Sequence, residues 1–263
     1  MNPPRVPLGR RGADGETRDP ATEWLLALER RHMADLTFSE VARALRALSS
    51  CYVERRSRLA DGGALGSRGK RAAFALFYGP LHLNITRQIV RTLGAPARRV
   101  RSVIDLGCGT GVAGAAWAIE SGAGRISGFD RNAWAVSEAN WTYSALDLRG
   151  RALQGDVVRA ALPKDAGSGI VLAYLANELA DEARARLLAQ LLTAGSHGAS
   201  VLVIEPIARR MAPWWSEWQD AFVAAGGRAD EWRFPADLPQ RQRELARAAG
   251  LNPRELTARS LSI

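Results

Sequence analysis

The chain has 263 residues, of which 47% are hydrophobic, enough for the core of an α/β domain with a smaller appendage. No apolar run reaches the roughly 18 residues that a membrane-spanning helix needs, and two cysteines, Cys51 and Cys108, are too few for a disulfide framework. The net charge of +9 belongs to residues 1–100, which hold 18 basic and 9 acidic residues, whereas the rest of the chain holds 18 of each.

Residues 1–20 are predicted to form a disordered tail, because they are rich in Pro, Gly and Arg. They contain no apolar segment of the kind that a secretory signal requires. Asp14, Glu16 and Asp19 are also unlike the acid-poor composition of a transit peptide. Together with the low cysteine content, this favours a cytoplasmic protein.

Residues 21–95 are predicted to form a basic helical module. Apolar side chains recur at helical spacing in 22–33, in a second segment that Ser39 would cap, and in 70–93, where Pro80 predicts a kink or a break. A basic module beside a neutral domain is typical of a protein whose substrate is a polyanion. The alternative is a compositional bias toward arginine, with the arginines solvated on the surface.

The segment 78–84 of the third helical region has the sequence Tyr-Gly-Pro-Leu-His-Leu-Asn, which is unusual inside a helix. We expect it to approach a cofactor or a substrate, with Tyr78 and Asn84 as candidate substrate contacts. Residues 94–99 read as a linker, and the following domain is predicted to cover residues 96–263.

The glycine-rich loop after the first predicted strand is the strongest functional signal. The apolar segment 103–106 contains Asp105 and runs into Gly107-Cys108-Gly109-Thr110-Gly111, after which 112–119 is predicted to be helical. Glycine tolerates a positive φ and has no Cβ, so the backbone of such a loop can approach a ligand closely. A strand-to-helix turn of this kind binds nucleotide-like ligands in α/β folds.

Two other interpretations of this loop are open. Residues 109–114 also satisfy the dinucleotide pattern G-x-G-x-x-G, but that pattern places its first glycine at the end of the strand, which here is Gly107. Counted from Gly107, the third position falls on Val112, and Asp105 would lie close to a pyrophosphate. A purely structural glycine turn is the other alternative.

The loop resembles motif I, E/D-x-G-x-G-x-G, of the class I methyltransferases that depend on S-adenosylmethionine (SAM). The resemblance implies an α/β fold: a Rossmann-like sheet of seven strands, mostly parallel with one antiparallel strand. It also implies SAM as the cofactor, bound by Asp105, Gly107, Cys108, Gly109 and Gly111. A carboxylate such as Asp105 can hold the ammonium group of SAM, directly or through an ordered water.

Acidic residues end the next two predicted strands. Asp130 closes the strand 125–130, where a carboxylate can accept from both ribose hydroxyls. Asp156 falls at the end of the third strand, where the resemblance implies that an acid accepts from the adenine amino group; alternatively, it only caps a turn. Arg131 and Val157, which follow these acids, are expected to line the same cofactor site.

The fourth predicted strand, 169–175, is a continuous apolar run that delivers Asn177 and Glu178 to the same edge of the sheet. The resemblance places them at motif IV, where a polar residue faces the methyl group and the nucleophile. We therefore predict Asn177 and Glu178 as catalytic residues that orient or deprotonate an acceptor. Alternatively, Asn177 N-caps the next helix and Glu178 lies in its first turn.

Aromatic residues concentrate after the fifth predicted strand, 201–206. We predict that Trp214 contacts the substrate and that Trp215 and Trp218 are core residues, but a stripe at this spacing is also typical of a helix packed on the sheet. The tryptophans predicted to pack on the sheet from the first two helices of the domain are Trp117, Trp134 and Trp141.

The resemblance makes 231–234 and 256–261 the last two strands, with a helix over 240–249 between them. The three histidines are scattered without the spacing of metal ligands, so no metal site is predicted.

Three segments are similar to a narrower family, the methyltransferase-like proteins associated with the small ribosomal subunit of bacteria and mitochondria. They are Leu48–Arg55, Ala73–Pro80 and Ala173–Leu179. Many members of that family carry a cysteine cluster for an iron–sulfur centre, which two scattered cysteines cannot build. The resemblance implies ribosomal RNA as the partner, bound through the basic N-terminal helices.

Three functions remain open on the sequence. They are methyl transfer to RNA in ribosome biogenesis, methyl transfer to a small molecule beneath a lid of N-terminal helices, and SAM binding by a ribosomal assembly factor without catalysis. A sulfonium methyl group is already activated, so transfer needs alignment more than chemical assistance. A base is needed only for a nucleophile of high pKa, and Glu178 is the candidate.

Overall fold

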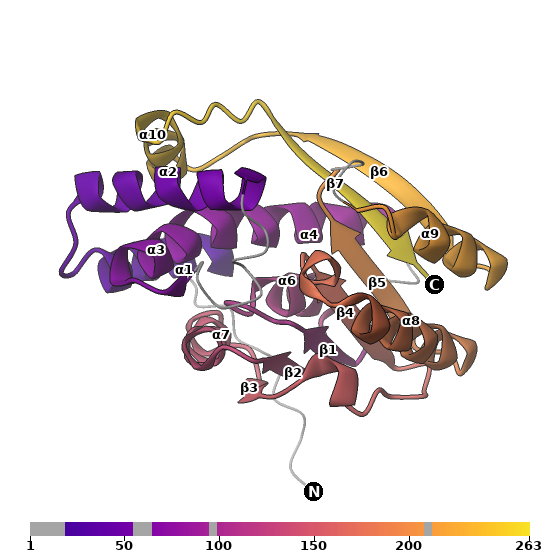
Figure 1. Cartoon of the computed structure of the whole chain (residues 1–263). Coiled ribbons are helices and arrows are strands. Elements are labelled where there is room, and N and C mark those ends of the chain that lie inside the picture. Colours follow the sequence, from indigo (N-terminus) through magenta and orange to yellow (C-terminus); the bar gives the residue numbers. More distant parts are fainter. Residues whose placement is uncertain (1–18, 55–64, 95–98, 208–211) are drawn as a thin grey trace, which may run out of the picture.

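The computed structural model describes residues 19–54, 65–94, 99–207 and 212–263. Most of the predicted tail at 1–20, the arginine-rich segment 55–58 and most of the linker at 94–99 lie outside the described residues. A seven-stranded sheet lies between two layers of helices (Figure 1).

The strands lie in the order β3-β2-β1-β4-β5-β7-β6, and β7 is antiparallel to both of its neighbours while the other pairs are parallel. This confirms the predicted α/β sheet of seven strands with one antiparallel strand. The strands are β1 (Ser102–Leu106), β2 (Arg125–Asp130), β3 (Gly150–Gln154), β4 (Ser168–Ala173), β5 (Ser200–Glu205), β6 (Arg228–Pro235) and β7 (Glu255–Ser262).

The helices are α1 (Pro20–His32), α2 (Phe38–Glu54), α3 (Arg68–Ala73), α4 (Gly79–Leu93), α6 (Val112–Ser121), α7 (Ala133–Ala145), α8 (Asp181–Ser196), α9 (Trp215–Ala224) and α10 (Gln240–Ala248). Helices α4, α6 and α7 cover one face of the sheet, and α8 and α9 cover the other (Figure 1). Helices α1, α2, α3 and α10 gather beyond the first layer at one end of the molecule.

Alternation along β1 assigns its side chains to the two faces. Val103 belongs to the hydrophobic cluster under α4 and α6, which contains Trp117. Leu106 belongs to the cluster under α8 and α9, which contains Trp215 and Trp218, as predicted for core residues. Full burial of one such large apolar side chain contributes about 1.5–3 kcal/mol.

The N-terminal helices share the first of these cores. Trp24 of α1, Leu45 of α2 and Ile89 of α4 are buried in the same cluster as Val103 and Trp117. The basic helical segment therefore covers the sheet through α6 and is stabilised by the same apolar contacts.

Two tryptophans of α7 face these helices and not the sheet, contrary to the prediction. The Arg31 guanidinium lies 4.9 Å from the centre of the Trp141 ring, and that of Arg71 lies 5.7 Å from the centre of the Trp134 ring. Both arginines thus gain cation–π contacts within the fold.

The start of α2 differs from the prediction by its cap. Thr37, and not Ser39, precedes the helix, and it forms a capping box with Glu40. The Glu40 carboxylate accepts from the Thr37 amide at 2.8 Å, and the Thr37 hydroxyl accepts from the Glu40 amide at 3.3 Å.

The predicted break at Pro80 takes the form of a π-helical turn, η3 (Phe74–Tyr78), between α3 and α4. Proline has no N–H, so the carbonyl four residues earlier, that of Leu76, loses its usual α-helical donor. The Gln242 side chain of α10 donates to this carbonyl at 3.2 Å. A residue distant in the sequence therefore satisfies the backbone group that the proline exposes.

A buried carboxylate on α7 holds the end of α1. Glu138 is 1% exposed, and it accepts from Arg31 Nε at 3.2 Å and lies 2.7 Å from His32 Nε2. Arg87 and Arg91 of α4 similarly pair with Glu120 of α6. Several basic side chains of the described N-terminal helices are therefore paired with carboxylates of the fold.

We expect Glu138→Ala to lower the free energy of unfolding by about 2 kcal/mol, because it leaves the half-buried His32 ring without its partner and removes a buried acceptor. Asp35→Ala is the matched control, since the Arg68–Asp35 pair is about 70% exposed on both sides and such pairs are worth under about 1 kcal/mol. Urea unfolding of the full chain measures both. Equal losses in the two variants would contradict the assigned role of Glu138.

Candidate functional site

The glycine loop leaves β1 with three residues in the left-handed region. Gly107, Gly109 and Gly111 have φ of +68°, +52° and +80°. A Cβ on Gly107 would lie 2.5 Å from the Leu175 side chain, whereas a Cβ on Gly109 would meet no atom within 4 Å. The loop is thus packed on its inner side at Gly107 and borders open space at Gly109.

Asp130, at the end of β2, supports this loop from the neighbouring strand. Its Oδ2 accepts from the Gly109 amide at 2.9 Å and its Oδ1 from the Asn132 amide at 2.8 Å. The side chain is half-buried. Each carboxylate oxygen has two acceptor positions, so one remains on each oxygen for a ligand.

Asp105 faces α6 and not the open side of the loop. Its Oδ2 accepts from the Gly114 amide at 2.8 Å, and its buried Oδ1 has no hydrogen-bond partner among the described residues. Burial, together with the nearby Asp130 charge, raises the pKa of Asp105 to about 7. The structure therefore places Asp105 beneath the first turn of α6, where it supports the loop through Gly114.

Gly114 is a residue of the site that the predictions missed. A Cβ at this position would lie 2.8 Å from Asp105 Oδ2, so only glycine allows α6 to approach β1 this closely. The signal was present as the third glycine of the G-x-G-x-x-G match. It marks helix–strand packing here, which is one of the roles of that glycine in the dinucleotide pattern.

Cys108 is buried within the loop, close to Gly128 of β2 and Tyr143 of α7. A Cβ added to Gly128 would lie 2.9 Å from Cys108 Sγ and 2.8 Å from the Tyr143 hydroxyl, so the three residues pack closely. Burial raises the pKa of the Cys108 thiol well above its ordinary value, which keeps it neutral. Its role in the site is to fill space beneath the loop.

Asp156 lies two residues after β3 and caps the short 3-10 helix η4 (Val157–Arg159), as the alternative interpretation of this residue predicts. Its Oδ1 accepts from the Val158 amide at 3.1 Å, and its Oδ2 lies 3.1 Å from Arg131 Nη2. Burial opposes the charge, but the Arg131 and Val158 contacts outweigh it and lower the pKa of Asp156. Asp156, Arg131 and the buried Val157 thus come together beyond the end of β3, close to Asp130, whose backbone carbonyl accepts from the Gly155 amide.

Asn177 lies in the 3-10 helix η5 (Ala176–Glu178) and bridges two buried side chains. Its Nδ2 donates to Glu205 Oε2 at 2.6 Å, and its Oδ1 accepts from Trp214 Nε1 at 3.0 Å. The alternative that Asn177 caps α8 is wrong, because α8 begins at Asp181 after Ala180. Glu178 is exposed beside it.

Glu205, at the end of β5, is the buried acceptor of this network. Burial raises the pKa of Glu205 to about 7, although hydrogen bonds from the Ala176 amide and Asn177 and the charge of Arg259 lower it. Trp214 is 8% exposed, and the Arg184 guanidinium lies 5.4 Å from the centre of its ring. Its indole N–H and most of its surface are therefore occupied by contacts within the fold.

Helix α4 reaches the end of β4 through aromatic contacts. The His82 ring stacks on Tyr174 with centroids 3.8 Å apart, and Tyr174 has a φ of +60°, which is unusual for an aromatic residue. Burial lowers the pKa of His82 to about 3, so the ring is neutral. The predictions missed both residues, because neither belongs to a local motif.

Of the predicted substrate contacts on this segment, Tyr78 lies 5.9 Å from the His82 ring, centroid to centroid, and its hydroxyl is 3.1 Å from Ser49 Oγ of α2. The neighbouring Gly79 packs on the loop: a Cβ there would be 3.8 Å from Thr110 Oγ1. Asn84 Oδ1 instead accepts from Gln88 Nε2 on its own helix.

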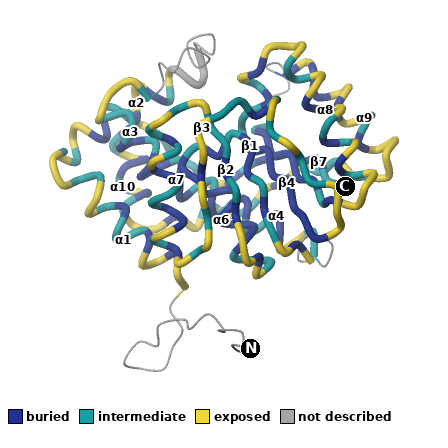
Figure 2. The backbone as a smooth tube through the Cα atoms, turned by 90° about the horizontal axis from the view of Figure 1, so that it is seen from below, coloured by how far each residue is buried: buried dark blue, intermediate teal, exposed yellow. Residues whose placement is uncertain are grey.

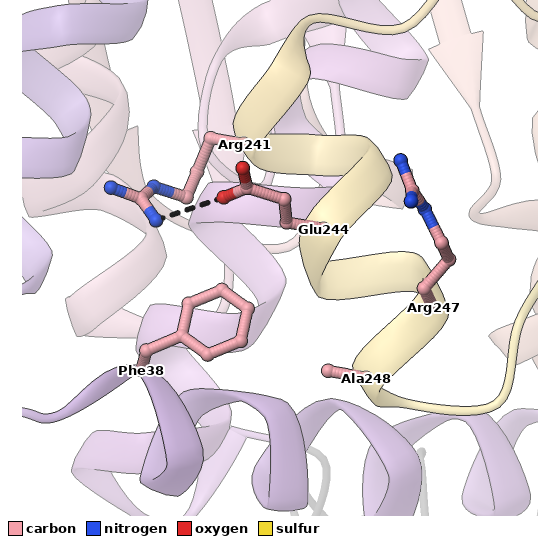
Figure 3. Close-up of a pocket in the computed structure, with 5 residues that line it drawn as sticks. All are labelled: Phe38, Arg241, Glu244, Arg247 and Ala248. Carbon is pink, nitrogen blue, oxygen red and sulfur yellow. Dashed lines mark hydrogen bonds and ion pairs between the residues drawn. The ribbon is translucent and has the colours of Figure 1, made fainter.

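A separate hollow of about 530 Å³ lies between α2 and α10. Figure 3 shows the side chains that line it: Phe38, Arg241, Glu244, Arg247 and Ala248. Arg241 is bound to Glu29 and Glu244 there. None of the loop or strand-end residues described above lines this hollow.

Within the described ranges, no group of three or more His, Cys, Asp or Glu side chains is arranged to hold a metal ion. In the same part of the chain, no helix is both long and apolar enough to cross a membrane.

Comparison with known proteins gives a family match over the site. Residues 84–172 match the methyltransferase small domain family. A search of curated protein sequences finds no match. Among solved structures, the chain is similar to mitomycin 7-O-methyltransferase MmcR, at 16% identity and a TM-score of 0.52, with 93% of this chain and 72% of that chain covered.

The chain is also similar to a structure of the Trm112 methyltransferase activator of Haloferax volcanii with a methyltransferase. The identity is 16% and the TM-score is 0.51, with 78% of this chain and 96% of that chain covered. At these identities, the two structures show a shared fold.

We expect the free energy of unfolding to fall as the pH rises from about 4 to about 7. Asp105 and Glu205 have pKa values near 7 in the fold, so the folded state keeps protons that the unfolded chain loses at lower pH. Asp105→Asn should flatten the fall and stabilise the chain at about pH 8, by no more than about 4 kcal/mol. Unfolding at a series of pH values measures this.

The exposed Asp147 also has a positive φ, so Asp147→Asn is a control that leaves the profile unchanged. If the unfolding free energy of Asp105→Asn varied with pH as that of the wild type does, the assignment of Asp105 as a buried, protonated carboxyl would be refuted.

Proposed function

We propose that this chain is a class I SAM-dependent methyltransferase and that it transfers the methyl group of SAM to RNA, with ribosomal RNA as the acceptor class. The methyltransferase family match at residues 84–172 contains the glycine loop, Asp130 and Asp156. Bound SAM supplies an activated sulfonium methyl group. The observation that carries the choice of RNA is the excess of basic over acidic residues in the first 100 residues, which include the run Arg55-Arg56-Ser57-Arg58.

The site residues fit SAM. The open space beside Gly109 leaves room for a ligand against the loop. Asp130 keeps an acceptor position on each oxygen, which suits the two ribose hydroxyls. Asp156 and Val157 would hold the adenine, with Arg131 beside them. Asp105 would act through Gly114, by fixing the first turn of α6 on which the loop depends.

Transfer needs alignment of the acceptor more than acid–base chemistry. Asn177 would align it by holding η5 to Glu205 and Trp214, so we assign it a positioning role. Glu178, exposed on the same short helix, is the carboxylate that would accept a proton from an acceptor of high pKa. The stacked rings of His82 and Tyr174, with Tyr78 beside them, would form the wall between the acceptor and α4.

The position of α2 supports an RNA acceptor. Ser49 of α2 contacts Tyr78, and the chain leaves this helix at Glu54, about 7.5 Å of helix further on. It then enters Arg55-Arg56-Ser57-Arg58. Because Arg31, Arg87 and Arg91 are already paired with carboxylates, we assign RNA binding to this run and to the other basic residues outside the described helices.

We expect Asp130→Ala to weaken SAM binding by about 10- to 100-fold, because hydrogen bonds to a charged group are worth roughly 1.5–3 kcal/mol. Isothermal calorimetry on the full chain measures the dissociation constant. Asp147→Asn, on the exposed turn before β3, is the control and should bind SAM as the wild type does. If Asp130→Ala kept the wild-type affinity, the ribose assignment would be rejected.

We expect the triple variant Arg55→Ala, Arg56→Ala and Arg58→Ala to bind RNA more weakly and with a smaller salt dependence. Each lost phosphate contact lowers the slope of log affinity against log salt by about 0.7. Binding of SAM should not change. Point substitutions are required, because deletion of residues 1–95 would remove side chains of the shared core.

Transfer of labelled methyl groups from SAM into RNA separates the alternatives. Label in RNA supports the proposal. RNA binding without label would indicate an assembly factor without catalysis, and indifference to RNA would indicate a small-molecule acceptor; either result would overturn it.

A further inference from the structure

The connection from β3 to β4 differs from the other parallel connections of the sheet. Helix α6 links β1 to β2, α7 links β2 to β3, and α8 links β4 to β5, but only η4 and a loop link β3 to β4. On the α8 side, no helix of this connection covers β2 and β3. Figure 2 shows exposed stretches along β3 at the edge of the sheet.

The contacts of two glycines establish which side chains point to this side. A Cβ on Gly128 or on Gly150 would run into Tyr143 of α7, so both residues face α7. Their neighbours along the strands therefore point to the opposite side. We call that surface the β2–β3 face; its residues are Arg125, Ser127, the partly buried Phe129, Arg149, Arg151 and Leu153.

Arginine dominates the β2–β3 face. Arg151 lies beside Ser127 in the register of β2 and β3, and the carbonyl of Arg149 accepts from the amide of Ile126, next to Arg125. All three arginine side chains are exposed, and none forms an ion pair with a carboxylate of the described residues. Leu153, which is 41% exposed, adds an apolar contact.

A groove lies on the same side, at the cofactor end of the sheet. This groove, of about 520 Å³, is lined by η4 and α8, and its arginines are Arg131, Arg159 and Arg186. Asp156 and Glu182 also line it, and they pair with Arg131 and Arg186, respectively. Arginines therefore lie on this side of the sheet both at the start of β2 and β3 and at the cofactor end, where two of them are paired with carboxylates.

We propose that the β2–β3 face binds the phosphate backbone of the RNA substrate. This inference rests on the proposed function. Charge complementarity argues for it, because exposed guanidinium groups without carboxylate partners bind phosphates in a bidentate manner. We choose RNA over an acidic protein because RNA is the substrate of the proposed function, and because these arginines lie at the start of the two strands that lead to Asp130 and Asp156. This second surface lies across the sheet from the N-terminal helices.

The test compares two double variants of the full chain. In Arg149→Ala with Arg151→Ala, two exposed charges of the face are removed. In Arg247→Ala with Arg254→Ala, one exposed charge is removed from the end of α10 and one from the residue before β7. Fluorescence anisotropy with a short fluorescein-labelled single-stranded RNA gives the affinity over a series of salt concentrations, and calorimetry with SAM checks the fold.

We expect the face variant to bind RNA more weakly and to lose about 1.4 from the slope of log affinity against log salt, at about 0.7 for each phosphate contact. The control variant keeps the wild-type slope, and both bind SAM as the wild type does. If the wild type binds RNA and the two variants behave alike, this inference is overturned and the proposed function stands. If the wild type itself binds no RNA, the proposed function fails first.

Discussion

The close approach of α6 to β1 is the contact on which the site depends. It requires glycine at position 114 and brings the backbone amide of that residue to the carboxylate of Asp105. The partial positive charge at a helix N-terminus favours an anion there, yet burial still raises the pKa of Asp105 to about 7. The hydrogen bond from Gly114 and the helix N-terminus therefore compensate only partly for the lost solvation of the Asp105 carboxyl. Asp130 restrains the same loop at Gly109 from the next strand.

The same helix also determines where the N-terminal segment lies. Its outer side packs against α4, and Gly79 of α4 touches Thr110 of the loop. The glycine loop and the segment that carries Tyr78 are consequently both positioned by α6. This arrangement explains why basic residues of α1 and α4 serve the fold: Arg31 and Arg87 hold their helices to carboxylates of α7 and α6. Part of the charge that predicted an interaction surface is therefore paired with carboxylates within the fold.

The sequence predicted those features that depend on neighbouring residues. A glycine loop after an apolar strand, and acids that end β2 and β3, are local patterns, and parallel strands bring their ends to one edge. Side-chain partners could not be predicted in this way. Asn177 was expected to face an acceptor or to cap a helix, but Glu205 and Trp214, both distant in the sequence, occupy its amide. The hydrogen bond from Gln242 to the Leu76 carbonyl could not be predicted either. It depends on the packing of α10 against η3, which are far apart in the sequence.

The amino-acid composition of each strand also indicates which of its two faces is covered by helices. The sequence of β4, Ser-Gly-Ile-Val-Leu-Ala, is apolar on both sides and is buried on both. The sequence of β3, Gly-Arg-Ala-Leu-Gln, alternates, and only Ala152 is buried. A crossover helix docked on the outer side of β3 would have to desolvate Arg149 and Arg151 without a described carboxylate to pair with them, at a cost of several kcal/mol for each charge. The exposed arginines on β3 are therefore consistent with a β3-to-β4 connection that has no α-helix.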